Sequence, residues 1–119
     1  MLKLSRFTLG VGDRFAHQAQ PQLQAFVQAA ERGAEIVPVW NKSNREHAII
    51  GSEPASVLAA AETAVQTLGW SRPYHVDADH IGLKIVDEFI DYSNFFTIDV
   101  AHFIGQPCGS HEKSNFIKD

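Results

Sequence analysis

The sequence predicts an α/β protein with parallel strands, and three observations carry that prediction. Apolar runs typical of strands alternate with stretches whose apolar residues recur at helical spacing. Glycines such as Gly33 and Gly69 follow the helical stretches, as expected at helix ends. Strands that alternate with helices imply right-handed crossovers and a parallel sheet covered by helices. The predicted order is therefore βαβαβαβ.

The first half of the chain is expected to contribute two strands and a helix. Residues 6–12 predict a strand that ends in glycines, and residues 22–32 predict a helix. Residues 35–40 predict a second strand, although Pro38 cannot donate to a strand ladder. Residues 41–46 are polar and predict a loop.

The second half repeats the same plan. A helix is expected to begin at residues 52–54 (Ser-Glu-Pro), because serine caps helices, glutamate favours the positive end of the helix dipole and proline suits the first turn. Residues 73–77 then predict a third strand. Apolar residues at helical intervals predict a helix over 83–90, and residues 95–100 predict a fourth strand.

Four strands and three helices leave two architectures open. One is a small, doubly wound sheet, and the other is part of a (β/α)8 barrel, which needs eight strands and about 250 residues. This chain has 119 residues. We expect residues 1–105 to form a partial TIM-type (β/α) barrel, half of a complete one. Residues 106–119 are rich in turn formers and predict an irregular tail.

Composition excludes several classes of protein. With 10 Lys and Arg against 14 Asp and Glu, the net charge is −4, which argues against a nucleic-acid partner. No apolar run approaches the roughly 18 residues of a membrane span. Cys108 is the single cysteine, so no intrachain disulfide is expected. The first residues lack the apolar core of a signal peptide, which predicts a cytoplasmic protein.

Polar residues gather where the predicted strands end. Ligands of parallel α/β folds bind at the carboxyl ends of the strands. The polar clusters at these ends are residues 12–14, 41–47 and 77–80, together with Asp99. The connections that lead into the strands have comparatively few such residues. This asymmetry predicts a ligand-binding site at the carboxyl ends of the strands.

The segment Asp77-Ala78-Asp79-His80 is the sharpest of these clusters. Asp77 and Asp79 alternate along an extended segment and would point to the same side, with an imidazole directly after them. Imidazole and carboxylate are ligands for zinc and similar divalent ions. The alternative is that both aspartates cap a following helix while His80 is merely exposed.

Basic residues at the other strand ends could bind an anionic ligand. Arg14 could place its guanidinium on a carboxylate, or it could pair with Asp13 in solvent. Lys42 and Arg45 would suit an anionic sugar or a phosphate if their loop folds over the site, although most such runs are solvated loops.

Four blocks of this sequence together resemble the tagaturonate/fructuronate epimerase family over about residues 7–105. The blocks are Gly10-x-Gly12-Asp13-Arg14, Asn41-Lys42-Ser43-Asn44-Arg45-Glu46, Asp77-Ala78-Asp79-His80 and Phe96-Thr97-Ile98-Asp99. Members of that family are metal-dependent barrel enzymes that invert C4 of a keto-hexuronate. The resemblance implies that His80 binds a divalent metal ion (zinc, nickel or similar) and that Asp79 is the proton acceptor.

The substrate implied by the resemblance is a small sugar acid. From charge and position we expect its contacts among Asp13, Arg14, Asn41, Lys42, Arg45, Asp77 and Asp99. Proton transfer and retro-aldol cleavage both suit a C4 epimerisation. In that family the other metal ligands and the proton donor belong to segments downstream of the block that matches residues 77–80, and we find no counterparts of them in this sequence.

Two further interpretations stay open. One is a metal-dependent sugar isomerase or aldolase on a similar barrel. The other is a non-catalytic half-barrel that assembles with a partner chain or with itself, because four parallel strands leave two unpaired edges.

Overall fold

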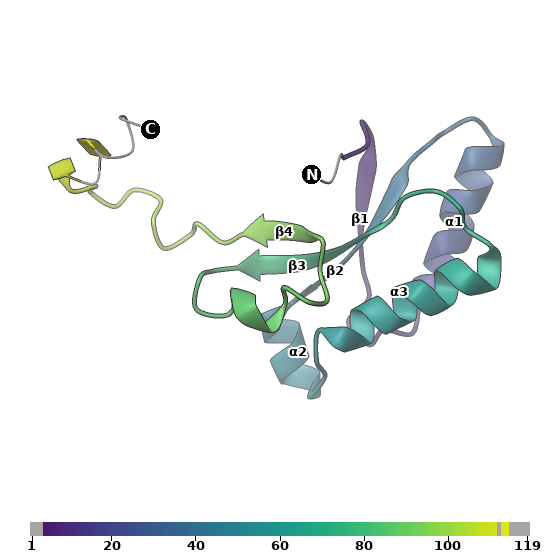
Figure 1. The fold of residues 1–119 in the computed structure, drawn as a ribbon, viewed down its shortest axis with the longest axis horizontal. Coiled ribbons are helices and arrows are strands. Elements are labelled where there is room, and N and C mark those ends of the chain that lie inside the picture. The colour runs from purple at the N-terminus through teal and green to yellow at the C-terminus, as the bar shows by residue number, and fades with distance from the viewer. Residues whose placement is uncertain (1–3, 112, 115–119) are drawn as a thin grey trace.

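Four parallel strands form one sheet with helices between them in the chain (Figure 1). The computed structural model describes residues 4–111, 113 and 114. Its elements in chain order are β1 (Thr8–Gly12), α1 (Ala19–Glu31), β2 (Val37–Ser43), α2 (Asn44–Ile50), α3 (Ala55–Leu68), β3 (His75–Ile81), the 3-10 helix η1 (Val86–Glu88) and β4 (Phe95–Ile98). The strand order is β1-β2-β3-β4, and every pair is parallel. The predicted α/β class, with four parallel strands in a partial sheet, is confirmed.

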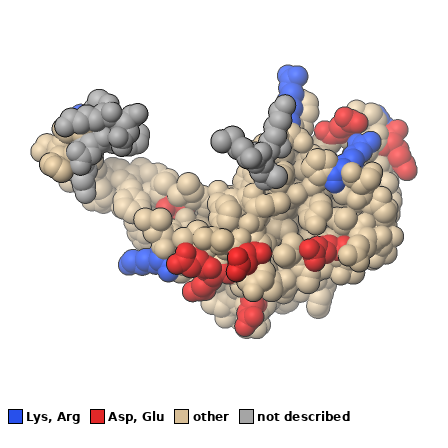
Figure 2. Space-filling view, in the orientation of Figure 1, with Lys and Arg blue, Asp and Glu red and all other residues tan. Residues whose placement is uncertain are grey.

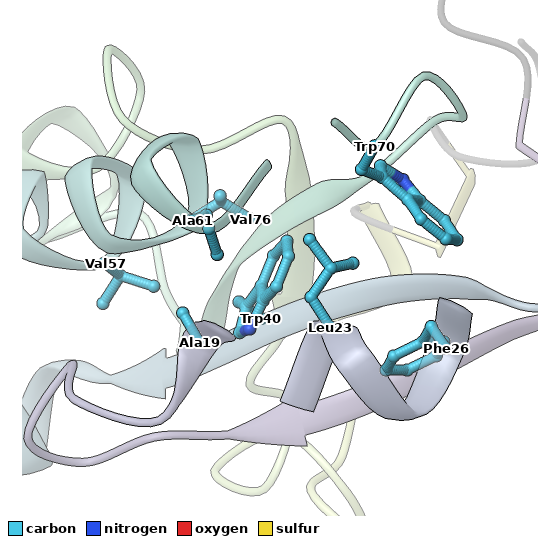
Figure 3. Close-up of a cluster of buried hydrophobic side chains, with 9 residues drawn as sticks. Ala19, Leu23, Phe26, Trp40, Val57, Ala61, Trp70 and Val76 are labelled. Carbon is cyan, nitrogen blue, oxygen red and sulfur yellow. The ribbon is translucent and has the colours of Figure 1, made fainter. Parts of the chain in front are cut away.

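The two long helices cover one face of this sheet. Trp40 of β2 points into a buried cluster with Leu23 of α1 and Ala61 of α3, and Val76 of β3 joins the same cluster (Figure 3). The indole Nε1 of Trp40 donates to Gln22 at 3.0 Å, so its polar atom is satisfied inside the core. Burial of this apolar layer fixes which face of each strand turns away from the helices.

The register aligns the carboxyl ends of the strands. Gly12 pairs with Asn41, Asn41 with Asp77, and Asp77 with Phe95. Strands β2, β3 and β4 continue beyond this row, to Ser43, Ile81 and Ile98. Side chains that follow the strands therefore meet at one edge of the sheet.

Residue Pro38 lies inside β2 without breaking the ladder. The N–H of Val37 donates to the carbonyl of Phe7 on the β1 side, at 3.0 Å. Alternate backbone groups of a strand face opposite neighbours, so the nitrogen of Pro38 faces the β3 side. Pairing with β3 begins only at Val39, so proline removes no hydrogen bond there.

The prediction of a polar loop over 41–46 is wrong. Strand β2 continues to Ser43, and α2 begins at the next residue. The two are joined by a capping box: the Ser43 hydroxyl accepts from the Glu46 N–H at 3.3 Å, and the Glu46 carboxylate accepts from the Ser43 N–H at 3.1 Å. The pattern Ser-x-x-Glu is visible in the sequence, but the polar composition masked it.

The predicted start of the next helix is also corrected. Helix α3 begins at Ala55, with Pro54 at its N-cap and no side-chain cap. The hydroxyl of Ser52 bonds instead to Lys42 and His47. The proline does suit the first turn, as expected.

The helix predicted over 83–90 is reduced to η1 and adjacent turns. Phe89 is buried against Ala78 and Ile81, whereas Leu83 is 94% exposed. Short helices depend on packing of an apolar face for their stability, and one buried side chain supplies little of it.

Strands β1 and β4 each have one neighbour among the described residues. Their apolar side chains are partly uncovered, with Leu9 53% and Ile98 71% exposed. After β4 the chain extends away from the sheet, and the surface of this extension is largely uncharged (Figure 2). Phe103 and Ile104 lie on it in exposed positions.

Residues 106–109, which follow this extension, have no regular structure. Residues 110, 111, 113 and 114 of the predicted irregular tail are helical, and the Lys113 N–H donates to the Gly109 carbonyl at 3.0 Å. The rest of the predicted tail, residues 112 and 115–119, lies outside the described residues. In the described part of the chain, no helix has the length and apolar character needed to cross a membrane.

Candidate active site

A pocket of about 490 Å³ opens at the carboxyl ends of the strands. It is lined by Ser43, Asn44, Arg45, Glu46, Asp79, His80, Ile85 and Asp99. These residues come from the ends of β2, β3 and β4 and from the segments that follow them. The structure thus brings together four of the predicted site residues, namely Arg45, Asp79, His80 and Asp99.

An irregularity in β3 places Asp79 and His80 together. Ala78 and Ile81 both pack in one buried apolar cluster although three positions separate them. Strict alternation would place them on opposite faces, but the β3–β4 register shifts between these two residues. His80 has a backbone φ of 58°, a left-handed value that residues other than glycine rarely adopt. The irregularity lets both neighbouring side chains reach the pocket.

Asp79 and His80 form a short ion pair. The Nδ1 atom of His80 lies 2.8 Å from Oδ1 of Asp79. This hydrogen bond, and then the charge of Asp79, raise the pKa of His80, and Asp99 adds to the effect. The His80 side chain is 66% exposed and that of Asp79 is 22% exposed, so the imidazole is the more accessible partner.

Asp99 is fixed at the end of β4 by its own backbone. Its N–H donates to the carbonyl of Ile81 at 3.0 Å, which continues the β3–β4 pairing. Its Oδ1 accepts from the N–H of Ala101 at 2.9 Å. Asp99 therefore presents a second carboxylate to the pocket that contains Asp79 and His80.

Two arginines approach the site differently. Arg45 is exposed and lines the pocket itself. Arg14 lies outside the lining, and its Nε is 3.3 Å from Oε1 of Glu46. The pKa of Glu46 is lowered, first by the N–H of Ser43 and further by Arg14, so Glu46 stays ionised between them. Arg14 thus connects the end of β1 to the rim of the pocket.

Lys42 lies away from the pocket. It is two residues after Trp40 in β2, so it faces the helix layer, where it is 1% exposed. Its Nζ donates to the Ser52 hydroxyl at 2.6 Å, and this hydroxyl lies 2.9 Å from Nδ1 of His47. His47 is itself buried, and its ring forms a T-shaped pair with that of Phe89 at a centroid distance of 5.8 Å. His47 belongs to the polar cluster 41–47 noted in the sequence, but no role was predicted for it.

Asn41 and Asp77 belong to the sheet face opposite the helices and do not line the pocket. Asp77 is buried and accepts two hydrogen bonds from Thr97, at 3.0 Å from its N–H and 2.8 Å from its hydroxyl. Burial nevertheless raises the pKa of Asp77. Asn41 lies against Gly10 and Gly12, where an added Cβ would come within 3.3 and 3.2 Å of its side chain.

Asp13 is also buried outside the pocket lining. Its carboxylate accepts the N–H of Gln18, the residue that precedes α1. Hydrogen bonds within the fold thus occupy the side chains of Asp13, Lys42 and Asp77, while Asn41 lies against two glycines. None of these four residues lines the pocket.

The described residues fit part of a metal site. Within residues 4–111, 113 and 114, no three His, Cys, Asp or Glu side chains are grouped so that they could hold a metal ion. His80 could supply one nitrogen ligand through Nε2, since Nδ1 is paired with Asp79. The carboxylate of Asp99 lines the same pocket.

The fold and the pocket define a class: a parallel α/β protein with an acidic, imidazole-containing site at the carboxyl ends of its strands. The sequence model of a family described as "UxaE: tagaturonate epimerase" matches residues 1–118. The chain belongs to this tagaturonate epimerase family.

Solved structures agree with this assignment. The native crystal structure of the fructuronate-tagaturonate epimerase UxaE from Cohnella laeviribosi superimposes with a TM-score of 0.70 at 27% identity, covering 95% of this chain and 24% of that one. A complex of the same protein with one glycerol gives a TM-score of 0.68 at 25% identity and covers 23% of that chain. This chain therefore spans about a quarter of the length of these proteins. No curated protein sequence matched it.

Proposed function

We propose that this chain contributes part of the active site of a metal-dependent epimerase that interconverts tagaturonate and fructuronate at C4. The observation that carries the proposal is the pocket in which Asp79, His80, Asp99 and Arg45 meet. The family membership and the epimerase structures support the substrate class.

Each of these residues suits one task in such a reaction. Arg45 has an exposed guanidinium at the pocket and can bind the uronate carboxylate, with Arg14 close by at the rim. Asp79 uses one carboxylate oxygen for His80, and the other can accept the proton at C4. His80 and Asp99 would hold the divalent ion, which supplies Lewis-acid polarisation of substrate oxygens when bound. A proton donor on the opposite face would come from another segment.

We further propose that the sheet is part of a TIM-type barrel in a cytoplasmic enzyme. Both sheet edges carry exposed apolar side chains, and the matched epimerases are about four times as long as this chain. Additional strands, from the same polypeptide or from a partner chain, would pair with β1 and β4 and enclose the sheet face that carries Asn41 and Asp77.

Turnover on matched sugars tests the substrate class. The complete polypeptide should epimerise tagaturonate and fructuronate, should lose activity on chelation and should recover it with zinc or nickel. Neutral ketoses lack the carboxylate, so their kcat/KM should be lower by about 10²-fold or more if a charged contact is lost. Arg45→Gln should remove most of this preference, whereas Arg32→Gln, at the remote end of α1, should preserve it.

Other preferences would contradict the proposal. Equal turnover of neutral ketoses and keto-hexuronates would indicate a general sugar isomerase. Cleavage to shorter fragments without epimer formation would indicate an aldolase. Full activity after metal removal would exclude the metal-dependent mechanism.

A further inference from the structure

We propose that Asp79 fixes the tautomer of His80 so that Nε2 is the ligating atom, and that Asp79 is thus a positioning residue in addition to its task as proton acceptor. The metal ligation rests on the proposed function, whereas the tautomer is a property of this chain alone.

Asp79 and His80 are joined by a hydrogen bond between their side chains. Nδ1 of His80 and Oδ1 of Asp79 are 2.8 Å apart, the length of a charge-assisted hydrogen bond. An ionised carboxylate only accepts, so the proton lies on Nδ1. In the neutral ring the lone pair is then on Nε2. Imidazole ligands of metals commonly donate their second ring N–H to a carboxylate in this way.

The backbone makes the pairing specific. Neighbouring side chains of a regular strand point to opposite faces, which would separate Asp79 from His80. Here the register shift after Ala78 and the φ of 58° at His80 turn both toward one pocket. Ile81 returns to the buried cluster directly afterwards. The pair is therefore held between two anchored apolar residues of the same strand.

The two oxygens of Asp79 then have separate tasks. Oδ1 is engaged by His80, and Oδ2 is the oxygen left for a substrate proton. Substitution separates the tasks: in Asp79→Asn an amide oxygen can still accept the Nδ1 proton, but the side chain cannot act as a base. Asp79→Ala loses both properties.

Nitrogen-15 NMR of the histidine rings tests the proposal on the complete polypeptide, kept free of metal and substrate. At alkaline pH, where the ring is neutral, we expect the His80 proton on Nδ1 in the wild type and in Asp79→Asn. In Asp79→Ala it should move toward Nε2. Asp87→Ala changes an exposed aspartate on η1 and should leave the tautomer as in the wild type.

Metal affinity gives the second readout. In the complete polypeptide, calorimetric titration with Zn²⁺ should show an affinity about 10–100-fold weaker for Asp79→Ala, and a much smaller loss for Asp79→Asn. A wild-type proton on Nε2, or equal Zn²⁺ affinities for wild type and Asp79→Ala, would overturn the proposal. Absence of epimerase activity would overturn the proposed function alone.

Discussion

Lys42 and Ser52 are joined by a hydrogen bond of 2.6 Å between the buried Nζ atom and the serine hydroxyl. The bond ties the end of β2 to the connection between α2 and α3. It also explains why a lysine predicted to contact substrate lies beneath the helices. The same hydroxyl lies within hydrogen-bond distance of Nδ1 of His47, so Ser52 is bonded to two buried basic side chains.

Alkaline pH should stabilise the protein through Lys42. Burial lowers the pKa of Lys42 from 10.5, although Glu46 and Asp13 act in the opposite direction. Between the folded and unfolded pKa values the unfolded chain binds more protons, so the free energy of unfolding rises with pH toward 10.5. Urea unfolding across this range should show a smaller rise in Lys42→Met. The exposed Lys84→Met should keep the wild-type slope, and an identical slope in both variants would contradict this prediction.

Acid should destabilise the protein through His47. Burial, and then the charge of Lys42, lower the pKa of His47 below 6.5. The unfolded chain binds the proton more tightly, so the free energy of unfolding falls as pH drops through 6.5 toward the folded pKa. His47→Gln should lose less stability between neutral and acidic pH in urea titrations. His102→Gln, at an exposed position, should follow the wild type; equal acid losses in all three proteins would disprove the assignment.

Removal of one hydroxyl should weaken the β3–β4 contact. Asp77 is buried and depends on the N–H and the hydroxyl of Thr97. Thr97→Val leaves one carboxylate oxygen without its partner and should cost about 1–3 kcal/mol in free energy of unfolding. Thr63→Val, on the exposed side of α3, is the control and should change stability by about 0.5 kcal/mol or less. A cost at Thr97 no larger than at Thr63 would show that the contact contributes nothing.

His75 should be replaceable by an apolar residue at no cost. Its side chain is 1% exposed beside Phe95, and neither ring nitrogen has a hydrogen-bond partner among the described residues. A buried polar group without a partner costs free energy. His75→Leu or His75→Phe should therefore leave the free energy of unfolding unchanged or raise it, by up to about 1–3 kcal/mol. A loss of stability in both variants, measured by thermal unfolding, would mean that the imidazole is bonded after all.

The strand order and the location of the site could be predicted from sequence. Apolar runs separated by helical periods were sufficient, because buried parallel strands are apolar and polar groups collect where they end. The extent of β2 was missed, and with it the orientation of Lys42. Once the strand reaches Ser43, alternation from Trp40 places Lys42 under the helices.

The geometry around His80 could not be predicted. A strand irregularity has no clear compositional signal, and the segment Asp77–His80 reads as a regular strand end. Regular alternation groups Asp79 with Asp77, and the charge of Asp79 does act on Asp77, which also accepts from Thr97. It would place His80 on the opposite face, whereas the structure pairs His80 with Asp79. This difference depends on contacts with β4, which lie far along the chain.

The central claim is that the pocket of Asp79, His80 and Asp99 belongs to a hexuronate epimerase. The most direct measurement is the interconversion of tagaturonate and fructuronate by the complete polypeptide, followed by carbon-13 NMR, in wild type, His80→Ala and His102→Ala. We predict turnover in wild type and in His102→Ala. In His80→Ala we predict that turnover falls by at least about 10²-fold and that the bound metal is lost. Undiminished turnover and metal content in His80→Ala would contradict it.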